Sequence, residues 1–484
     1  MQGLTSVLGA QGGAVAFLAL VLVVLGVRVL RWRLRLERPW LWWPVFGAPA
    51  ALVRLVWTWR ATCEGLGLSV PAKRFSRYGL ISGSGDGGRR GGGLIVKGEP
   101  LKLIAPRRVR VRISGCGLVL VVRLHPGQVP GQWERAGEAF AHQWRVHRVR
   151  VISERPGFVT LTGLGFDPLR FPPPPQKQKE PEAAGSRQLA GAGGPRPQRT
   201  DYAVIPGILA VRVGVGEDGG PWVIDLGKHP HYLVTGATRS GKSTLSVRLG
   251  TELARRPVIL VGIDAKNGME LAPFGPRLSA LAVSRAEAAA ALDALVGVMY
   301  LRMLICREQG ARSIWELQVE VRPEPVVVLV DEVAELFLAI DKQGKEEAGR
   351  CVNGLVRIGQ LGAALGVHLW VAGQRFGSDL GPGATLLRAQ LSGRICHRVA
   401  DPETATMTLA GLPPEAVTEA QRIGVDLAGV AVVGDDSGTW GLARSAPVSI
   451  AAAKAVAGEF ASLAVPLPEV TAAIENIRLT GGGW

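Results

Sequence analysis

The chain has 484 residues, of which 47% are hydrophobic and 20% charged, and its formal net charge is +16. This length corresponds to about three domains of roughly 150 residues each, and the hydrophobic content excludes an intrinsically disordered chain. The five cysteines are scattered, with no C-x-x-C pair and no histidine at ligand spacing, which argues against a disulfide scaffold, a zinc site and an iron–sulfur cluster.

The positive charge is concentrated towards the N-terminus. Residues 1–110 carry 17 Lys and Arg against 4 Asp and Glu, whereas residues 201–484 carry 26 against 30. A basic stretch beside an apolar segment is typical of a surface that faces anionic lipid on the cytoplasmic side of a membrane. The net charge alone is therefore poor evidence for DNA binding.

The first expected element is a transmembrane helix over residues 12–30. No charged residue occurs from Gly3 to Val27, and about 20 apolar residues span a bilayer as a helix. No basic stretch precedes the apolar run, as a cleavable signal peptide would require, so we expect a retained anchor. By the positive-inside rule, the arginines that follow predict an outside N-terminus and a cytoplasmic remainder; these are Arg28, Arg31, Arg33, Arg35 and Arg38.

The segment Trp40–Trp59 contains five tryptophans, two prolines and Arg54. Because tryptophan is enriched at the headgroup level of membranes, we expect an interfacial or re-entrant segment, with a second span as the alternative. A second span would place the arginine-rich connector outside, against the charge rule. Residues 1–60 are thus expected to be the membrane anchor, and residues 61–99, which include the glycine-rich run 79–93, a basic neck beside anionic lipid.

A small α/β domain is expected over residues 100–168. Apolar and polar residues alternate at strand period over Val109–Arg123 and Val149–Gly163, and Pro130–Gln143 has the pattern of a helix. The proline-rich, charged segment 172–200 has no periodicity, which predicts a linker.

The rest of the chain predicts one larger α/β domain over residues 201–448, followed by a tail over 449–484. Short apolar strands separated by helical stretches indicate a parallel sheet covered by helices on both faces. The expected strands are His231–Thr235, Val258–Asp264, Val326–Asp331, Val367–Ala372 and Arg394–Val399.

A phosphate-binding loop follows the first of these strands and precedes a helix. Its G-x-x-x-x-G-K-S pattern lets backbone N–H groups surround phosphates, with the positive end of the helix dipole behind them. Lys242 is expected to neutralise the β- and γ-phosphates of ATP, and the Ser243 hydroxyl to ligate Mg²⁺. The nucleotide-binding residues are expected to be Gly236, Ala237, Thr238, Arg239, Ser240, Gly241, Lys242, Ser243 and Thr244.

Two acidic residues follow the apolar strand Val326–Val330. A phosphate-binding loop requires a further carboxylate for the metal at the tip of a neighbouring strand, and Asp331 fits this position. Glu332 is placed to orient and deprotonate the attacking water. The sequence therefore predicts ATP hydrolysis rather than binding alone.

Several blocks together resemble the FtsK/SpoIIIE family of hexameric DNA-pumping ATPases, which have a RecA-like P-loop motor. They occur in the family's order around the phosphate-binding loop: Asp225–Gly236 (DLGKHPHYLVTG), Asp264–Leu271 (DAKNGMEL), Asp331–Leu336 (DEVAEL), Leu365–Arg375 (LGVHLWVAGQR) and Arg394–Val399 (RICHRV). One departure is Phe376, where the family has proline after the Gln-Arg pair.

The resemblance implies further roles. Gln374 corresponds to the sensor of the γ-phosphate, and Arg394 or Arg398 to the arginine that reaches the nucleotide of the next subunit in a homohexamer. The positions that match the family's DNA-contacting channel loops are Lys342, Lys345 and Arg375.

The order of anchor, tryptophan-rich neck, small domain, linker and single motor resembles the conjugative transfer proteins (TraB/Tra type) of actinomycetes. This likeness implies a membrane-anchored hexameric ATPase that moves double-stranded DNA between cells. Two alternatives stay open: a chromosome-segregation translocase, which would be expected to have several spans and a terminal DNA reader, and a type VII-like protein-secretion ATPase, which would be expected to have several motor domains in tandem.

Overall fold

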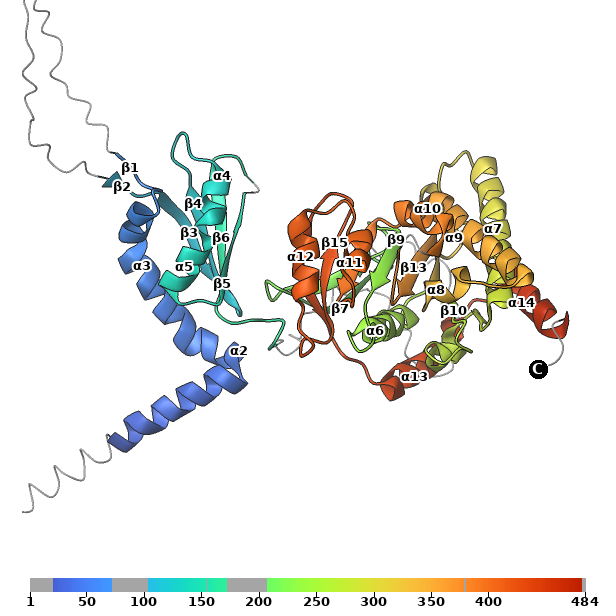
Figure 1. Ribbon diagram of the computed structural model, residues 1–484, viewed down its shortest axis with the longest axis horizontal. Helices are drawn as coiled ribbons and strands as arrows, with labels where there is room; N and C mark the ends of the chain where they lie inside the picture. Colours follow the sequence, from blue (N-terminus) through green and yellow to red (C-terminus); the bar gives the residue numbers. More distant parts are fainter. Residues whose placement is uncertain (1–20, 72–102, 154, 172–206, 378–379, 481–484) are drawn as a thin grey trace, which may run out of the picture. The chain divides into compact units, whose positions relative to one another are not determined.

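The structure is a computed structural model that describes residues 21–71, 103–153, 155–171, 207–377 and 380–480. The chain divides into two compact units, Met1–Pro173 and Pro174–Trp484, and each is described here by itself (Figure 1). The predicted linker 172–200, most of the predicted basic neck and residues 1–20 lie outside the described residues.

Only the second half of the predicted transmembrane segment falls within the described residues. Residues 21–37 are helical and mostly exposed. Among the described helices, α7 (Arg285–Glu308) has the length and apolar composition to cross a membrane. Half of its apolar window is buried, and Leu292, Leu295 and Met299 belong to the core of the C-terminal unit, so α7 is a core helix. The span over residues 12–30 stays a prediction.

The tryptophan-rich segment folds as a helical wall of the N-terminal unit, formed by α2 (Pro39–Trp42), a π-helical turn η1 (Trp43–Gly47) and α3 (Ala48–Gly65). Trp42, Trp43 and Trp59 are buried, and the Trp59 ring stacks on Trp133 at 6.2 Å between centroids. These three side chains therefore belong to the core of the unit, whereas Trp57 is 83% exposed, and the interfacial segment and the second span stay predictions. The three buried side chains pack against the unit's own sheet because that burial removes the same apolar area from water.

The sheet of the N-terminal unit is antiparallel, with the strand order β3-β4-β6-β5. Alternate residues of β4 and β6, among them Leu120 and Leu161, are fully buried against α3 and α5. The two predicted alternating segments are each divided by a turn into a hairpin, and the predicted helix is divided into two. The bounds are β1 (Val70–Pro71), β2 (Leu103–Ile104), β3 (Arg107–Ile113), β4 (Gly117–Arg123), α4 (Pro130–Arg135), α5 (Gly137–Trp144), β5 (Arg148–Ile152) and β6 (Phe158–Leu164).

The C-terminal unit is built on a ten-stranded sheet. All five predicted strands are present in its parallel part, which runs β11 (Ala280–Ala282), β10 (Ile259–Ile263), β12 (Val326–Val330), β13 (Val367–Gly373), β9 (His231–Thr235) and β14 (Gly393–His397). Four antiparallel strands that the sequence pattern did not predict extend it: β15 (Val430–Gly434), β16 (Trp440–Ser445), β7 (Ala210–Gly216) and β8 (Pro221–Asp225).

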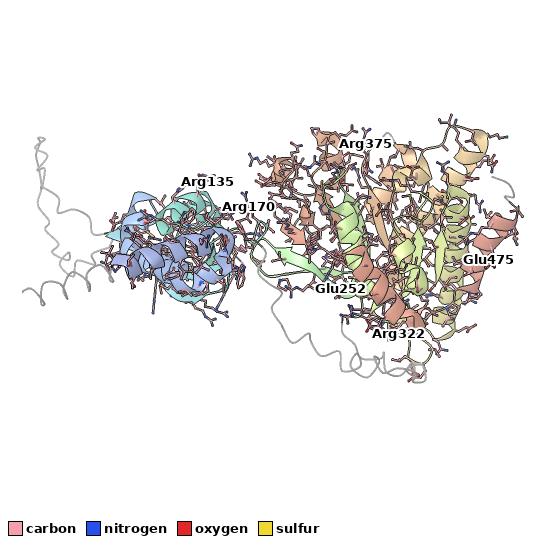
Figure 2. All side chains as sticks on the ribbon, turned by 90° about the horizontal axis from the view of Figure 1, so that it is seen from below. Arg135, Arg170, Glu252, Arg322, Arg375 and Glu475 are labelled. Carbon is pink, nitrogen blue, oxygen red and sulfur yellow. The ribbon has the colours of Figure 1, made fainter. Side chains whose placement is uncertain are left out.

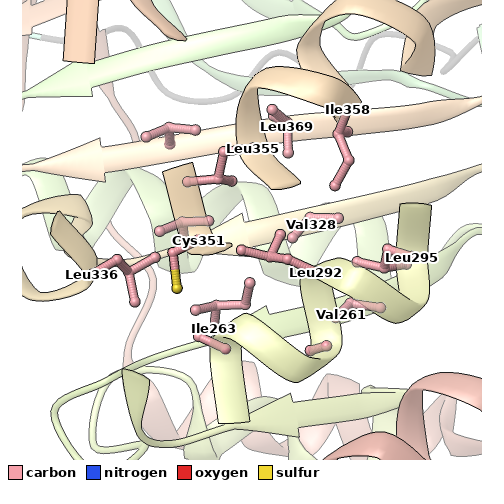
Figure 3. Packing of buried hydrophobic residues seen from close by; sticks show 14 of the residues in the cluster. Val261, Ile263, Leu292, Leu295, Val328, Leu336, Cys351, Leu355, Ile358 and Leu369 are labelled. Atoms are coloured by element: carbon pink, nitrogen blue, oxygen red, sulfur yellow. The ribbon is translucent and has the colours of Figure 1, made fainter. Parts of the chain in front are cut away.

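Helices cover both faces of this sheet, as predicted for parallel strands. Successive residues of one strand point to opposite faces, so that Val328 packs under α7 and α9 (Lys342–Leu365), whereas Val327 and Leu329 pack under α6 (Lys242–Ala254). Figure 3 shows the first of these cores, where Leu292 and Leu295 of α7 lie above Val261 and Val328.

The remaining helices are short or lie at the edges of the unit. Their bounds are η3 (Ala272–Arg277), η4 (Ile314–Glu316), α8 (Val333–Phe337), α10 (Pro382–Gln390), α11 (Pro402–Thr408), α12 (Pro414–Arg422), α13 (Ile450–Glu459), η6 (Ala461–Leu463) and α14 (Pro468–Thr480).

The segment predicted as a tail from residue 449 is part of the motor core. Ala453 and Ala457 of α13 are buried beside α6, and Val470 and Ile474 of α14 are buried against α7. The boundary at 448 is therefore wrong, because the sheet needs both helices to cover apolar surface that would otherwise face water.

Candidate nucleotide-binding and catalytic site

The site lies at the carboxyl edge of the parallel strands. Register aligns the strand ends: Thr235 of β9 pairs with Gly373 of β13 and Cys396 of β14, and Val330 of β12 pairs with Ile263 of β10. The residues that follow these strands therefore meet at one edge, where open α/β sheets bind their ligands. The predicted loop, acidic pair and sensor all follow such ends.

The phosphate-binding loop has a backbone that depends on its glycines. Gly241 precedes α6 with φ +108, and a Cβ there would overlap the backbone of Gly429. The Ala237 N–H donates to the Arg398 carbonyl at 2.9 Å, and the Gly429 N–H to the Ser240 carbonyl at 2.8 Å. Residues next to β14 and β15 thus hold the loop in place.

Lys242 lies against the two predicted acidic residues. Its side chain is buried, and Nζ donates to the Asp331 carbonyl at 2.9 Å. The same Nζ is 3.7 Å from Asp331 Oδ1 and 3.9 Å from Glu332 Oε2. The structure thus brings together the three residues on which the hydrolysis prediction depends.

A second lysine completes this buried cluster of charges. Lys266 Nζ is 3.6 Å from Glu332 Oε2. Asp264, at the end of β10, accepts hydrogen bonds from the backbone N–H groups of Lys266, Glu270 and Leu271, and so shapes the loop that presents this lysine. The block Asp264–Leu271 resembles the family, but a role for Lys266 could not be predicted from it, because the contact with Glu332 depends on β10 lying beside β12.

Glu270, in the same loop, also faces the site. Burial raises the pKa of its carboxyl group, and the negative charge of Asp331 raises it further. The block Asp264–Leu271 that carried the resemblance, with its Asp-x-Lys-x-x-x-Glu spacing, was the signal for this residue as well.

Gln374 links the loop to the predicted base. Its backbone N–H donates to both carboxylate oxygens of Glu332, at 3.1 and 3.2 Å, and the Thr238 hydroxyl donates to its Oε1 at 3.4 Å. A side chain between the phosphate loop and the base has the position that a γ-phosphate sensor needs.

The two candidate trans arginines have different surroundings. Arg394 is largely buried in β14, its Nη2 donates to the Arg388 carbonyl at 2.9 Å, and burial lowers its pKa to about 10. Arg398 follows the same strand, and its Nη2 reaches the Thr238 carbonyl of the chain's own loop at 3.2 Å. Neither contact involves a second subunit.

The three predicted DNA-contacting residues are all exposed. Lys342 and Lys345 lie in the first turn of α9, after the loop that follows β12. Arg375 follows β13, and Figure 2 shows it at the end of the unit opposite to Arg322, which precedes β12. All three therefore belong to the nucleotide edge of the sheet.

The donor set at the loop fits a magnesium nucleotide. The two lysines and two acidic residues of the cluster balance in formal charge, so a triphosphate would bring an excess of negative charge that a divalent cation offsets. Hydroxyl and carboxylate oxygens, such as those of Ser243 and Asp331, are ligands that Mg²⁺ prefers beside phosphates. Among the described residues, no group of three or more His, Cys, Asp or Glu side chains could hold a metal alone.

Two family models match this chain. The N-terminal domain of actinomycete conjugal transfer proteins matches residues 29–165, and the FtsK/SpoIIIE family matches residues 196–322 and 316–378. The second match covers the phosphate-binding loop, the acidic pair and Gln374. Both matches agree with the resemblance found in the sequence.

Three curated relatives extend these matches. A sporulation regulatory protein of Streptomyces azureus is 48% identical over 266 residues, which cover 55% of this chain and 88% of that protein. Transfer protein TraSA of Streptomyces ambofaciens is 38% identical over 378 residues, which cover 76% of this chain and 85% of that protein. DNA translocase SftA of Bacillus subtilis is 35% identical over 205 residues, 40% of this chain and 20% of that protein.

Proposed function

This chain belongs to the FtsK/SpoIIIE family, in its actinomycete conjugal transfer branch, and on this basis we propose that it is an ATPase that translocates double-stranded DNA during conjugation. The observation that carries the ATPase assignment is the contact of Lys242 with Asp331 and Glu332 beneath the phosphate-binding loop. The names of two relatives, a transfer protein and a DNA translocase, support the coupling to DNA.

ATP binding changes the ion pairs of the charge cluster formed by Lys242, Lys266, Asp331 and Glu332. The phosphates of the nucleotide lie on the N–H groups of the loop and of the first turn of α6, and Lys242 turns from the two carboxylates towards them. Ser243 and Asp331 would hold Mg²⁺, which would supply positive charge against the phosphate oxygens.

Hydrolysis depends on Glu332. Released from Lys242, its carboxylate accepts a proton from the attacking water, and the Gln374 N–H fixes its orientation. The Gln374 side chain, which contacts Thr238 of the loop, reports whether a γ-phosphate is present. Loss of that phosphate therefore alters the end of β13, where Arg375 begins the loop that faces DNA.

The active assembly is a homohexamer in which each ATP is completed by an arginine of the next subunit. Arg394 is the proposed trans residue and Arg398 is its alternative. Lys342, Lys345 and Arg375 contact the phosphate backbone in the channel, which makes DNA binding salt-dependent and largely independent of sequence.

The chain is anchored in the cell membrane by residues 12–30, with the N-terminus outside and the motor in the cytoplasm. Two features support this proposal: the apolar run is followed by five arginines, and α3 exposes Val53, Val56 and Trp57 on the side away from its core. The basic residues beside the span interact with anionic lipid.

The test is the ATPase rate of the full chain with double-stranded DNA, single-stranded DNA or an unfolded polypeptide added. Stimulation by duplex alone is the expected result. Stimulation by polypeptide alone would instead identify a secretion ATPase. Glu332→Gln is the matched control that reports contaminating ATPases, because it keeps the size and hydrogen-bonding capacity of the side chain.

A further inference from the structure

One face of the sheet in the N-terminal unit is left open by the helices. The pairing of the strands defines this open face. Arg110 of β3 lies opposite Val121 of β4, which lies opposite Thr160 of β6. In the same way, Arg112 lies opposite Val119, which lies opposite Thr162. Intervening residues such as Leu118, Leu120 and Val122 are buried on the other side, under α3 and α5. Direct partners share a face, so Arg110 and Arg112 belong to the open one.

Arginines occupy both edges of this open face. On β5, Arg150 lies opposite Thr162, and Arg148 precedes it by two residues on the same side. Arg107 lies directly opposite Arg123, although like charges in that position repel each other. The arginines of the open face, all of them exposed, are Arg107, Arg110, Arg112, Arg123, Arg148 and Arg150.

The described strands β3 to β6 contain no Asp or Glu, so the strands themselves carry a net positive charge. The centre of the face consists of small β-branched side chains, among them Val119, Val121, Thr160 and Thr162, which are half-buried. Near one end, the guanidinium of Arg155 lies over the Phe158 ring at 5.0 Å from its centroid. A surface of this charge is complementary to a polyanion.

The geometry favours a duplex over a lipid surface. In the order β3-β4-β6-β5, the two arginine-bearing edges are three strand spacings apart, or about 14 Å. This separation is close to the width of the DNA major groove, about 12 Å. A lipid surface is contacted through large exposed apolar side chains, and those of this unit lie mainly on residues 22–36, on α3 and along β2 and β3. On β3, Val111 and Ile113 lie opposite Leu120 and Leu118, on the other face of the sheet.

We propose that the open face of the β3–β6 sheet is a second DNA-binding surface, which holds the phosphate backbones of duplex DNA outside the motor channel. The choice of duplex DNA rests on the proposed function. The motor domain, with 26 Lys and Arg against 30 Asp and Glu over residues 201–484, has no charge excess with which to attract DNA from solution. The open face supplies that attraction, through contacts that do not read sequence.

The test compares two double variants of the full chain that lose the same charge. Arg110→Gln with Arg112→Gln alters the open face, whereas Arg60→Gln with Arg135→Gln alters exposed arginines of α3 and α4 (Arg135 is labelled in Figure 2). Without nucleotide, the open-face variant should bind a 30-base-pair duplex about tenfold more weakly, with a salt slope smaller by about 1.8. The other variant should bind like the unaltered chain.

Equal duplex binding by the two variants would overturn the proposal. So would an open-face variant that loses binding only to vesicles containing anionic lipid, since the occupant would then be a membrane. Arg110→Lys with Arg112→Lys should restore most of the duplex affinity and its salt dependence, which distinguishes lost charge from a misfolded sheet.

A second measurement does not depend on removing charge. A photo-crosslinker on Thr162→Cys, at the centre of the open face, should capture duplex DNA, and one on Arg135→Cys should not. Capture at both positions or at neither would contradict the proposal. A different result would show that the proposed function itself is wrong. In that case duplex DNA would neither bind the unaltered chain nor stimulate its ATPase activity.

Discussion

At the scale of single residues, the chain gathers four charges where the nucleotide is expected and buries three of them. Lys242, Lys266, Asp331 and Glu332 neutralise one another in pairs, and all but Lys266 are less than a tenth exposed. Removing one member of such a cluster leaves a buried charge without a partner. The cluster is therefore a fixed electrostatic environment that exists before ATP arrives.

Two substitutions separate ATP binding from ATP hydrolysis. Lys242→Ala should abolish both, because it removes the charge that meets the phosphates. Glu332→Gln should preserve binding and lower the turnover number by about 10²–10⁴-fold, because the amide cannot take a proton from water. Fluorescent-nucleotide titration and an ATPase assay measure the two effects; normal turnover in Lys242→Ala would refute the site.

Buried histidines make the C-terminal unit sensitive to acid. Burial lowers the pKa of His231 to about 3 and that of His368 and His397 to about 4. The unfolded chain takes up these protons below about pH 6.5, so the free energy of unfolding falls as the pH drops from there towards 4. At pH 5 each histidine should account for about 2 kcal/mol, from about 1.36 kcal/mol per pH unit.

His231→Asn tests this sensitivity, because asparagine keeps an acceptor for the Leu369 N–H and does not titrate. Hydrogen exchange of the β9 and β13 amides at pH 7.5 and 5.0 should show a smaller loss of protection in the variant, by about 2 kcal/mol. An equal loss in both proteins would mean that His231 does not contribute.

The sequence predicted the residues whose signal is local. Lys242 lies within a contiguous loop pattern, and Asp331 and Glu332 directly follow an apolar strand. These residues can therefore be predicted without knowledge of the fold. Lys266 and Glu270 act through contacts between neighbouring strands, and the order of strands in a sheet is not written in any one segment.

At the scale of elements, those with a local sequence signal were again predicted and the others were missed. Strands β9, β10, β12 and β13 were predicted because they are buried on both faces and are mostly apolar. The strands β7 and β16 were missed, because Ala210–Gly216 and Trp440–Ser445 contain glycine and arginine and resemble loops. The burial of Trp42, Trp43 and Trp59 was not predicted, because a tryptophan is apolar enough for either a membrane interface or a protein core.

Two tryptophans of α3 distinguish these roles by experiment. Trp59 is 4% exposed and donates to the Pro106 carbonyl, whereas Trp57 is 83% exposed. Trp59→Ala should destabilise the N-terminal unit by about 3–5 kcal/mol, and Trp57→Ala by less than about 0.5 kcal/mol. Hydrogen exchange of the β4 and β6 amides measures both; similar effects would mean that α3 does not pack as described.

At the scale of the whole molecule, two kinds of surface are divided between two units. The N-terminal unit carries the exposed apolar residues of α3 and the arginines of the open face, and the C-terminal unit carries the nucleotide edge. The family match accounts for this division, because it joins a conjugal transfer N-terminal domain to a motor that also occurs in other DNA translocases.

Subunit mixing tests the proposal that the active site is shared between subunits. Arg394→Ala copies keep an intact phosphate site but lack the trans arginine, and Lys242→Ala copies have the opposite defect. Each variant alone should have a turnover number lower by about 10³-fold or more. A mixture of the two should regain part of the turnover, because an Arg394→Ala copy can bind ATP at an interface where a Lys242→Ala copy supplies Arg394. If Arg398→Ala complements instead, Arg398 is the trans residue; recovery with neither would mean that the site lies within one chain.

The central claim, that ATP hydrolysis moves this chain along double-stranded DNA, is tested most directly by displacement of a third strand from a duplex. The full chain should release a triplex-forming oligonucleotide placed at a distance from its loading site, with ATP and not in the Glu332→Gln variant. ATP hydrolysis that is stimulated by the duplex but releases no oligonucleotide, at any spacing, would contradict it.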